Sequence, residues 1–98
     1  MEISERIYNG NRAKEVLENE SFQWAINSIK DEVTEQWKQS PVRDIEGREK
    51  LWMMLQLANK LEAVLKTTLE TGKLAEKELE HKQSLAKRGI SAISNAFR

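Results

Sequence analysis

The stretch QSPVRDIEGR, residues 39–48, is the one strong interruption in an otherwise helix-forming sequence. Pro41 disfavours helical geometry at Ser40 and has no amide hydrogen to donate, so a helix is expected to end there. Asp44 is well placed to accept hydrogen bonds from the first amides of a following helix. A connection this short makes its two helices antiparallel neighbours, so residues 40–45 are predicted to form the turn of a helical hairpin.

Upstream of the turn, residues 12–39 have the periodicity of one amphipathic helix. Its apolar positions are Ala13, Val16, Leu17, Phe22, Ala25, Ile26, Ile29, Val33 and Trp37. The Asn-Gly-Asn sequence at residues 9–11 supplies turn and capping residues, so residues 1–11 are predicted to be an N-terminal extension. A second interpretation stays open, because Asn19 or Ser21 could cap a fresh start and leave residues 12–18 as a separate short helix.

Downstream of the turn, residues 46–71 are predicted to form the second helix. Its apolar residues follow a heptad pattern, which is typical of helices packed side by side. The seven-residue repeat runs through Leu51, Ala58, Leu65, Gly72, Leu79 and Ala86, with Met54, Leu61, Thr68 and Ala75 at the intermediate positions. Leu57 and Val64 add a second apolar stripe beside this seam. The apolar arc is therefore wider than one neighbouring helix can cover, which predicts self-association or docking on a larger assembly.

Gly72 interrupts a long, charged helical sequence and has two interpretations. It can end or kink the second helix, so that residues 73–88 restart as a third helical segment. Alternatively the helix continues through Gly72, and the missing side chain admits a closely packed neighbouring helix.

Residues 81–98 form a small basic arm on an acidic body, and its last segment, residues 89–98, is the predicted tail. All 16 acidic residues precede His81, whereas four of the 16 basic residues follow it. These four, Lys82, Lys87, Arg88 and Arg98, are candidates for contact with nucleic-acid phosphates or an acidic protein surface. Ile90, Ile93 and Phe97 fall on one side of a short amphipathic segment and are candidate partner contacts.

The three tryptophans divide into two groups. Trp37 ends the first predicted helix and Trp52 starts the second, so the hairpin brings them to one end, where they are expected to pack on each other over the turn. Trp24 lies about 200° around the helix from Phe22 and Ile26, away from the main apolar stripe. It is therefore the leading candidate for an intermolecular contact.

Chemistry-bearing patterns are weak throughout. The chain has no cysteine, which excludes a thiolate nucleophile, and its single histidine gives no support for a His-based triad. Its four glycines are isolated, so the sequence has no glycine-rich phosphate-binding loop. Glu78 and His81 have Glu-x-x-His spacing, but a di-iron carboxylate site needs that motif twice. We expect a non-enzyme without metal or cofactor. No apolar run is long enough for a membrane span or a secretion signal, so neither membrane insertion nor secretion is expected.

Two further segments carry a resemblance to a family. The turn EQW…SPVRDIEGREKLW followed by LETGKLA resembles a group of small helical proteins encoded by tailed bacteriophages, over residues 12–76. This resemblance implies a phage context, in the host cytoplasm or the virion, and supplies no active site.

Together these patterns predict a single all-α domain, a long antiparallel hairpin with a third C-terminal helical segment. The leading functional prediction is a non-enzymatic assembly component of a phage particle that binds protein through Trp24, Leu57, Val64, Gly72 and its tail. Two alternatives stay open. One is a nucleic-acid-binding packaging factor resembling a terminase small subunit, with its tail on DNA, and the other is a helical regulator of a host protein.

Overall fold

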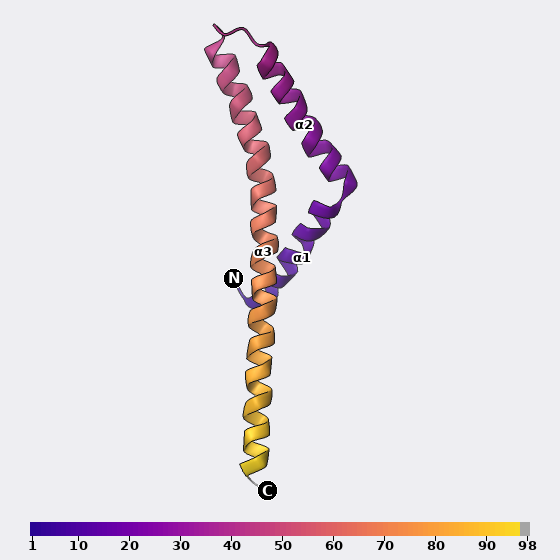
Figure 1. The fold of residues 1–98 in the computed structure, drawn as a ribbon, viewed down its shortest axis with the longest axis vertical. Helices are drawn as coiled ribbons and strands as arrows, with labels where there is room; N and C mark the ends of the chain where they lie inside the picture. Colours follow the sequence, from indigo (N-terminus) through magenta and orange to yellow (C-terminus); the bar gives the residue numbers. More distant parts are fainter. Residues whose placement is uncertain (97–98) are drawn as a thin grey trace.

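The computed structural model describes the backbone of residues 1–96 and the side chains of residues 1–89. Over that backbone it contains three α-helices and no strand: α1 (Ile3–Glu18), α2 (Glu20–Gln39) and α3 (Ile45–Ala96). The predicted all-α class is therefore confirmed. The molecule measures 83 × 25 × 16 Å, because α3 runs almost its whole length while α2 and then α1 lie along one end and the middle of it (Figure 1).

The turn between α2 and α3 is closed by its own side chains and by one from α3. Ser40 adopts extended backbone geometry, and its hydroxyl donates to the Trp37 carbonyl at 2.6 Å. Asp44 Oδ1 accepts from the amide of Gly47 at 3.0 Å, which is the predicted cap of the next helix. Arg48 ties the two ends together, because its Nη1 donates to Ser40 Oγ at 2.8 Å. The antiparallel hairpin predicted from residues 39–48 is confirmed.

The chain before the turn differs from the prediction at both of its boundaries. Helix α1 begins at Ile3, so residues 1–11 are not an extension and residues 9–11 form no turn. Residues 12–39 are not one helix, because the chain breaks at Asn19, whose backbone is extended. The Asn19 Oδ1 atom accepts from the Phe22 amide at 2.9 Å and caps α2. The open interpretation of a separate helix ending at residue 18 is confirmed, although that helix starts earlier.

Gly72 lies inside α3, which continues through it as one helix of 52 residues. A Cβ atom built on Gly72 would lie 2.8 Å from the Cα of Gly10 and 3.0 Å from the carbonyl oxygen of Arg6. The backbones of α1 and α3 therefore touch at this crossing, with no room for a side chain on either glycine. Of the two interpretations of Gly72, the continuous helix is confirmed, and an end of the helix there with a restart at residue 73 is wrong.

The buried core is small and built mainly from small side chains. Among the described side chains, its apolar members are Ala13, Ile26, Val33, Ala58 and Ala75. Leu51 and Leu65 are half-buried, as the heptad pattern predicts. Met54 and Leu61 occupy predicted seam positions as well, yet they are 52% and 47% exposed. The predicted seam is thus wrong at these two positions, because α2 packs on a neighbouring face of α3, and it is wrong at Leu79 and Ala86, which are exposed as well.

Candidate protein-interaction surface

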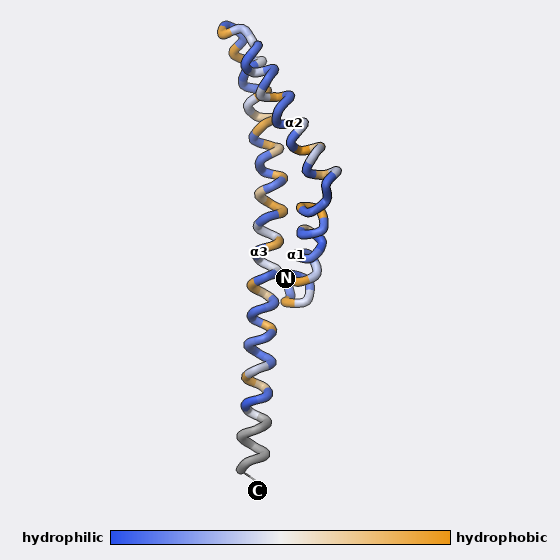
Figure 2. Tube along the Cα trace, turned by 45° about the vertical axis from the view of Figure 1, so that its right-hand side comes forward, coloured by the Kyte–Doolittle hydropathy of each residue, from blue (hydrophilic) through white to orange (hydrophobic). Residues whose placement is uncertain are grey.

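Five large apolar side chains form an exposed strip on α3 beside α2. We call Met53, Met54, Leu57, Leu61 and Val64 the α3 stripe. They are 62%, 52%, 71%, 47% and 48% exposed, respectively. At about 100° per residue, all five fall within an arc of about 100° on one side of the helix. Figure 2 shows hydrophobic residues recurring along this half of α3. The exposure of Leu57 and Val64 agrees with the second stripe predicted for them.

The face of α3 that α2 covers lies next to the stripe but does not include it. Ala58 is buried there, and Leu55 and Glu62 are half-buried. Lys30 of α2 forms an ion pair with Glu62, whose side chain is 14% exposed. This partly buried pair holds α2 over the side of α3 that carries Glu62. That side lies about 100° around the helix axis from Leu61. The stripe is therefore left without an intramolecular neighbour.

Helix α1 covers the continuation of the same arc further along α3. Ala75 falls in the angular range of the stripe and is 0% exposed. Thr68 falls in the same range and is half-buried where α1 crosses. The break at Asn19 lets α1 pack on a different face of α3 from α2. The stripe thus ends where α1 begins to cover α3.

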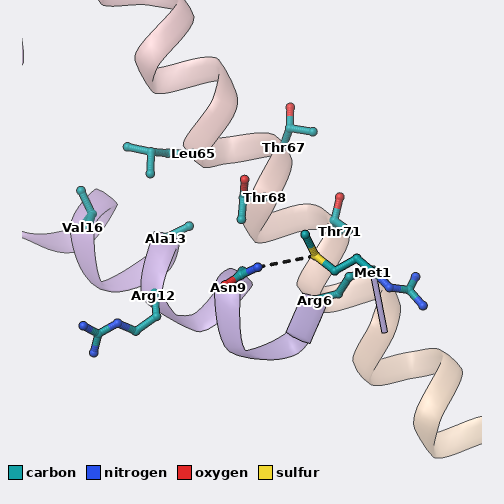
Figure 3. Close-up of a pocket in the computed structure, with 10 residues that line it drawn as sticks. All are labelled: Met1, Arg6, Asn9, Arg12, Ala13, Val16, Leu65, Thr67, Thr68 and Thr71. Atoms are coloured by element: carbon teal, nitrogen blue, oxygen red, sulfur yellow. Dashed lines mark hydrogen bonds between the residues drawn. The ribbon is translucent and has the colours of Figure 1, made fainter. Parts of the chain in front are cut away.

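A hollow of about 550 Å³ marks that boundary between α1 and α3 (Figure 3). Its walls include Ala13 and Val16 from α1 and Leu65 and Thr68 from α3. The Thr68 hydroxyl donates to the Val64 carbonyl of its own helix at 2.7 Å. This threonine hydroxyl is therefore engaged within α3, and the hollow continues the stripe toward the α1 crossing.

The tryptophans occupy three different positions on the surface. Trp24 is 74% exposed, and it lies on α2 about 200° around from Ile26, which is buried against α3. It therefore faces away from the stripe, and the structure does not bring Trp24 together with Leu57 or Val64. Its exposure agrees with the prediction, while its role in an intermolecular contact stays a prediction.

Trp37 and Trp52 line one apolar pocket of about 230 Å³ beside the turn. Both therefore lie at the same end of the hairpin, as predicted. They remain 43% and 58% exposed. The guanidinium of Arg48 lies 4.2 Å from the Trp37 ring centroid. This cation–π contact adds to the closure of the turn.

Ion pairs on the second half of α3 centre on Glu78. Glu78 forms ion pairs with Arg6 of α1 and with Lys82, both at 3.4 Å. His81 is exposed nearby. Among the described residues, no three His, Asp or Glu side chains gather in a group that could hold a metal ion. No described helix is both long and apolar enough to cross a membrane.

The tail residues are only partly within the described structure. Lys87 and Arg88 are exposed on the projecting end of α3, beyond the reach of α1 (Figure 1). The side chains of Ile90 and Ile93 lie outside the described residues. Phe97 and Arg98 lie outside them altogether.

Comparison with protein-family models, curated proteins and solved structures finds no match for this chain. The resemblance to tailed-phage proteins therefore stays a prediction.

The sequence did not predict two features of the structure. One is Gly10, which was interpreted as part of a turn. The spacing of Arg6, Gly10, Ala13 and Leu17 is helical. The two small residues among them, Gly10 and Ala13, allow another helix to approach. The other is Met53, which lies beside Leu57 on the stripe.

Proposed function

We propose that this chain is a non-enzymatic helical assembly module that binds protein through the α3 stripe. The observation that carries this proposal is a contiguous strip of five large apolar side chains, 47–71% exposed, beside a core made mainly of alanine and valine-sized groups. Contiguous exposed apolar surface of this kind marks sites of protein association. Methionine is moreover enriched at protein interfaces.

The total exposed area supports the same proposal. The chain exposes 8008 Å². A compact monomer of 11.4 kDa is expected to expose about 5,800 Å². The excess of about 2,200 Å² reflects the elongated shape of 83 × 25 × 16 Å, which leaves surfaces such as the stripe exposed that a compact fold would bury. Covering the stripe with protein removes apolar surface from water, which contributes about 25 cal/mol for each Å².

The resemblance to tailed-phage proteins supplies the biological setting, a structural or assembly component of a phage particle. The alternative of a DNA-packaging factor has weaker support. Lys82 is paired with Glu78, which leaves Lys87 and Arg88 as the exposed tail cations with described side chains. Affinity for DNA comes largely from Lys and Arg side chains that neutralise phosphates, so two such cations give weaker support for DNA binding than the stripe gives for protein binding.

A photocrosslinking experiment tests the proposal. Benzoylphenylalanine replaces Leu57 on the stripe or, as the matched control, Asn59, which is exposed about 160° away on the same helix. Irradiation of the protein in phage-producing cells is expected to give a discrete protein adduct from position 57 and little from position 59. Equal adducts from both positions, or none from position 57, would contradict the proposal.

The phage setting has its own test. The chain is expected to co-purify with particles at a fixed stoichiometry, and Leu57→Glu is expected to abolish this while Asn59→Glu preserves it. Particles that lack the unmodified chain at every stage of assembly would overturn the phage setting without affecting the interaction surface.

A further inference from the structure

We infer that the partner on the α3 stripe is a second copy of this chain, bound about a two-fold axis with the two α3 helices antiparallel. This inference rests on the proposed function, since it names the protein that occupies the same surface. Three observations support it: the spacing of the stripe, the position of α1, and the area left exposed.

The spacing of the stripe is the same in both directions along the helix. Met54, Leu57, Leu61 and Val64 are separated by steps of three, four and three residues. A two-fold interface needs a patch that is complementary to its own copy. Antiparallel pairing centred between the leucines places Leu57 opposite Leu61 of the other copy, with Met54 and Val64 at the two ends. The most exposed stripe residue, Leu57 at 71%, then lies at the centre of the interface.

The position of α1 selects the antiparallel orientation. Helix α1 covers the arc of the stripe from about Thr68 onward, so it projects on the side where the second copy binds. In a parallel pair, both α1 helices would stand at the same level between the two α3 helices and hold them apart. In an antiparallel pair they stand at opposite ends. This arrangement also opposes the two helix dipoles, which is favourable.

The length of the stripe sets the crossing geometry. Met53 and Val64 mark its ends, so the contact spans about three helical turns. Short contacts of this kind suit helices that cross at about −50°, the commonest packing class in globular proteins. At this crossing angle, the N-terminal end of each α3 diverges from the other copy's α3 and passes beside the other copy's α1.

The exposed area fits this partner. Stable interfaces bury about 800 Å² on each side. The five stripe side chains, 47–71% exposed, supply the apolar centre of such an interface. Pairing along the stripe buries these five side chains on both copies at once.

Light scattering tests the stoichiometry. The unmodified chain is expected to have twice its monomer mass of 11.4 kDa. Leu57→Glu buries a carboxylate on each side of the axis and is expected to raise the dissociation constant at least about 100-fold. Asn59→Glu is the matched control and is expected to remain dimeric. Circular dichroism of each variant checks that the helices persist, and Leu61→Glu repeats the test at the second central position.

Pulsed electron paramagnetic resonance tests the orientation. The chain has no native cysteine, so Glu76→Cys gives one spin label on each copy. At 1.5 Å per residue, an antiparallel pair crossing near the stripe centre separates the two labels by about 45 Å or more, and a parallel pair by about 25 Å or less. A short distance would overturn the antiparallel arrangement.

The outcomes separate this inference from the proposed function. A monomeric chain whose position-57 probe still forms an adduct with a different protein overturns the second copy as partner and leaves the interaction surface intact. A monomeric chain with no adduct overturns both. A dimer that Leu57→Glu leaves unchanged overturns the inference, because the copies then associate through another surface.

Discussion

Gly10 and Gly72 are the two residues at which α1 and α3 touch through their backbones. In an isolated helix, replacing an interior glycine by alanine is favourable by about 1 kcal/mol. At this crossing the same replacement is expected to lower the free energy of unfolding, because a Cβ on either glycine would lie 2.8 Å from the Cα of the other. A glycine that weakens α3 locally thus stabilises the packing of the whole molecule.

Gly72→Ala tests this reversal. The two helices must separate to admit the methyl group, so the free energy of unfolding is expected to fall by about 1–2 kcal/mol after the gain in helix propensity is subtracted. Urea denaturation followed by circular dichroism measures it. Gly89→Ala is the matched control, because a Cβ there would meet no atom within 4 Å. Equal effects of both substitutions would show that the crossing is not tight.

The ion pair of Lys30 with Glu62 is the one described polar link that ties α2 to the middle of α3. Both side chains are less than one-third exposed, at 26% and 14%, so solvent screens the pair only in part. A double-mutant cycle with Lys30→Met and Glu62→Gln is expected to give a coupling free energy of about 1 kcal/mol. A coupling near zero would indicate that apolar contacts alone hold α2 over this face.

At the scale of the elements, the break at Asn19 decides how the first two helices cover the third. A single straight helix over residues 3–39 would follow one face of α3. Because the backbone is extended at Asn19, the chain changes direction there, and α1 and α2 cover different faces of α3. The uncovered stripe is the geometric result of this break.

Asn19→Ala removes the cap of α2. The Phe22 amide then loses its acceptor at 2.9 Å, and the free energy of unfolding is expected to fall by about 1 kcal/mol. Thermal denaturation measures the change. Asn27→Ala is the control, because Asn27 is exposed inside α2, where alanine is the better helix former. A loss of stability in the control as large as that at Asn19 would argue against a role for the cap.

At the scale of the whole molecule, stability is expected to vary along α3. The buried residues of α3 lie between Ala58 and Ala75, where α2 and α1 pack on it. Residues 80–89 are all exposed, and the end of this segment projects beyond α1 (Figure 1). An unsupported helix end of this length is marginal in water. One continuous helix therefore contains a packed part and a solvated part.

Hydrogen exchange of the backbone amides measures this gradient. Amides between residues 58 and 75 are expected to exchange slowest, and those of residues 80–89 are expected to exchange fastest within α3. Uniform protection up to residue 89 would mean that the projecting end packs against another chain. The inferred antiparallel dimer is expected to add protection mainly along the stripe, so dilution to monomer is expected to speed amide exchange there more than at residue 75.

The local features of this fold could be predicted from the sequence. Pro41 and Asp44 mark the turn because they act through the geometry and hydrogen bonds of their immediate neighbours. The apolar arc of α3 was likewise predicted to be wider than one helix can cover, since its width depends only on spacing along a single helix. The start of α1 could not be placed, because the turn residues around Gly10 also suit a helix when another backbone packs against them.

By itself, the sequence determined the all-α class, the antiparallel hairpin and the excess of apolar surface on α3, because propensity, capping and periodicity are properties of short segments. Only the tertiary structure decided that α3 continues through Gly72 and that Met54 and Leu61 stay exposed. These outcomes depend on contacts between residues far apart in the chain: the glycine crossing of α1 with α3, and the face of α3 to which Lys30 and Glu62 hold α2.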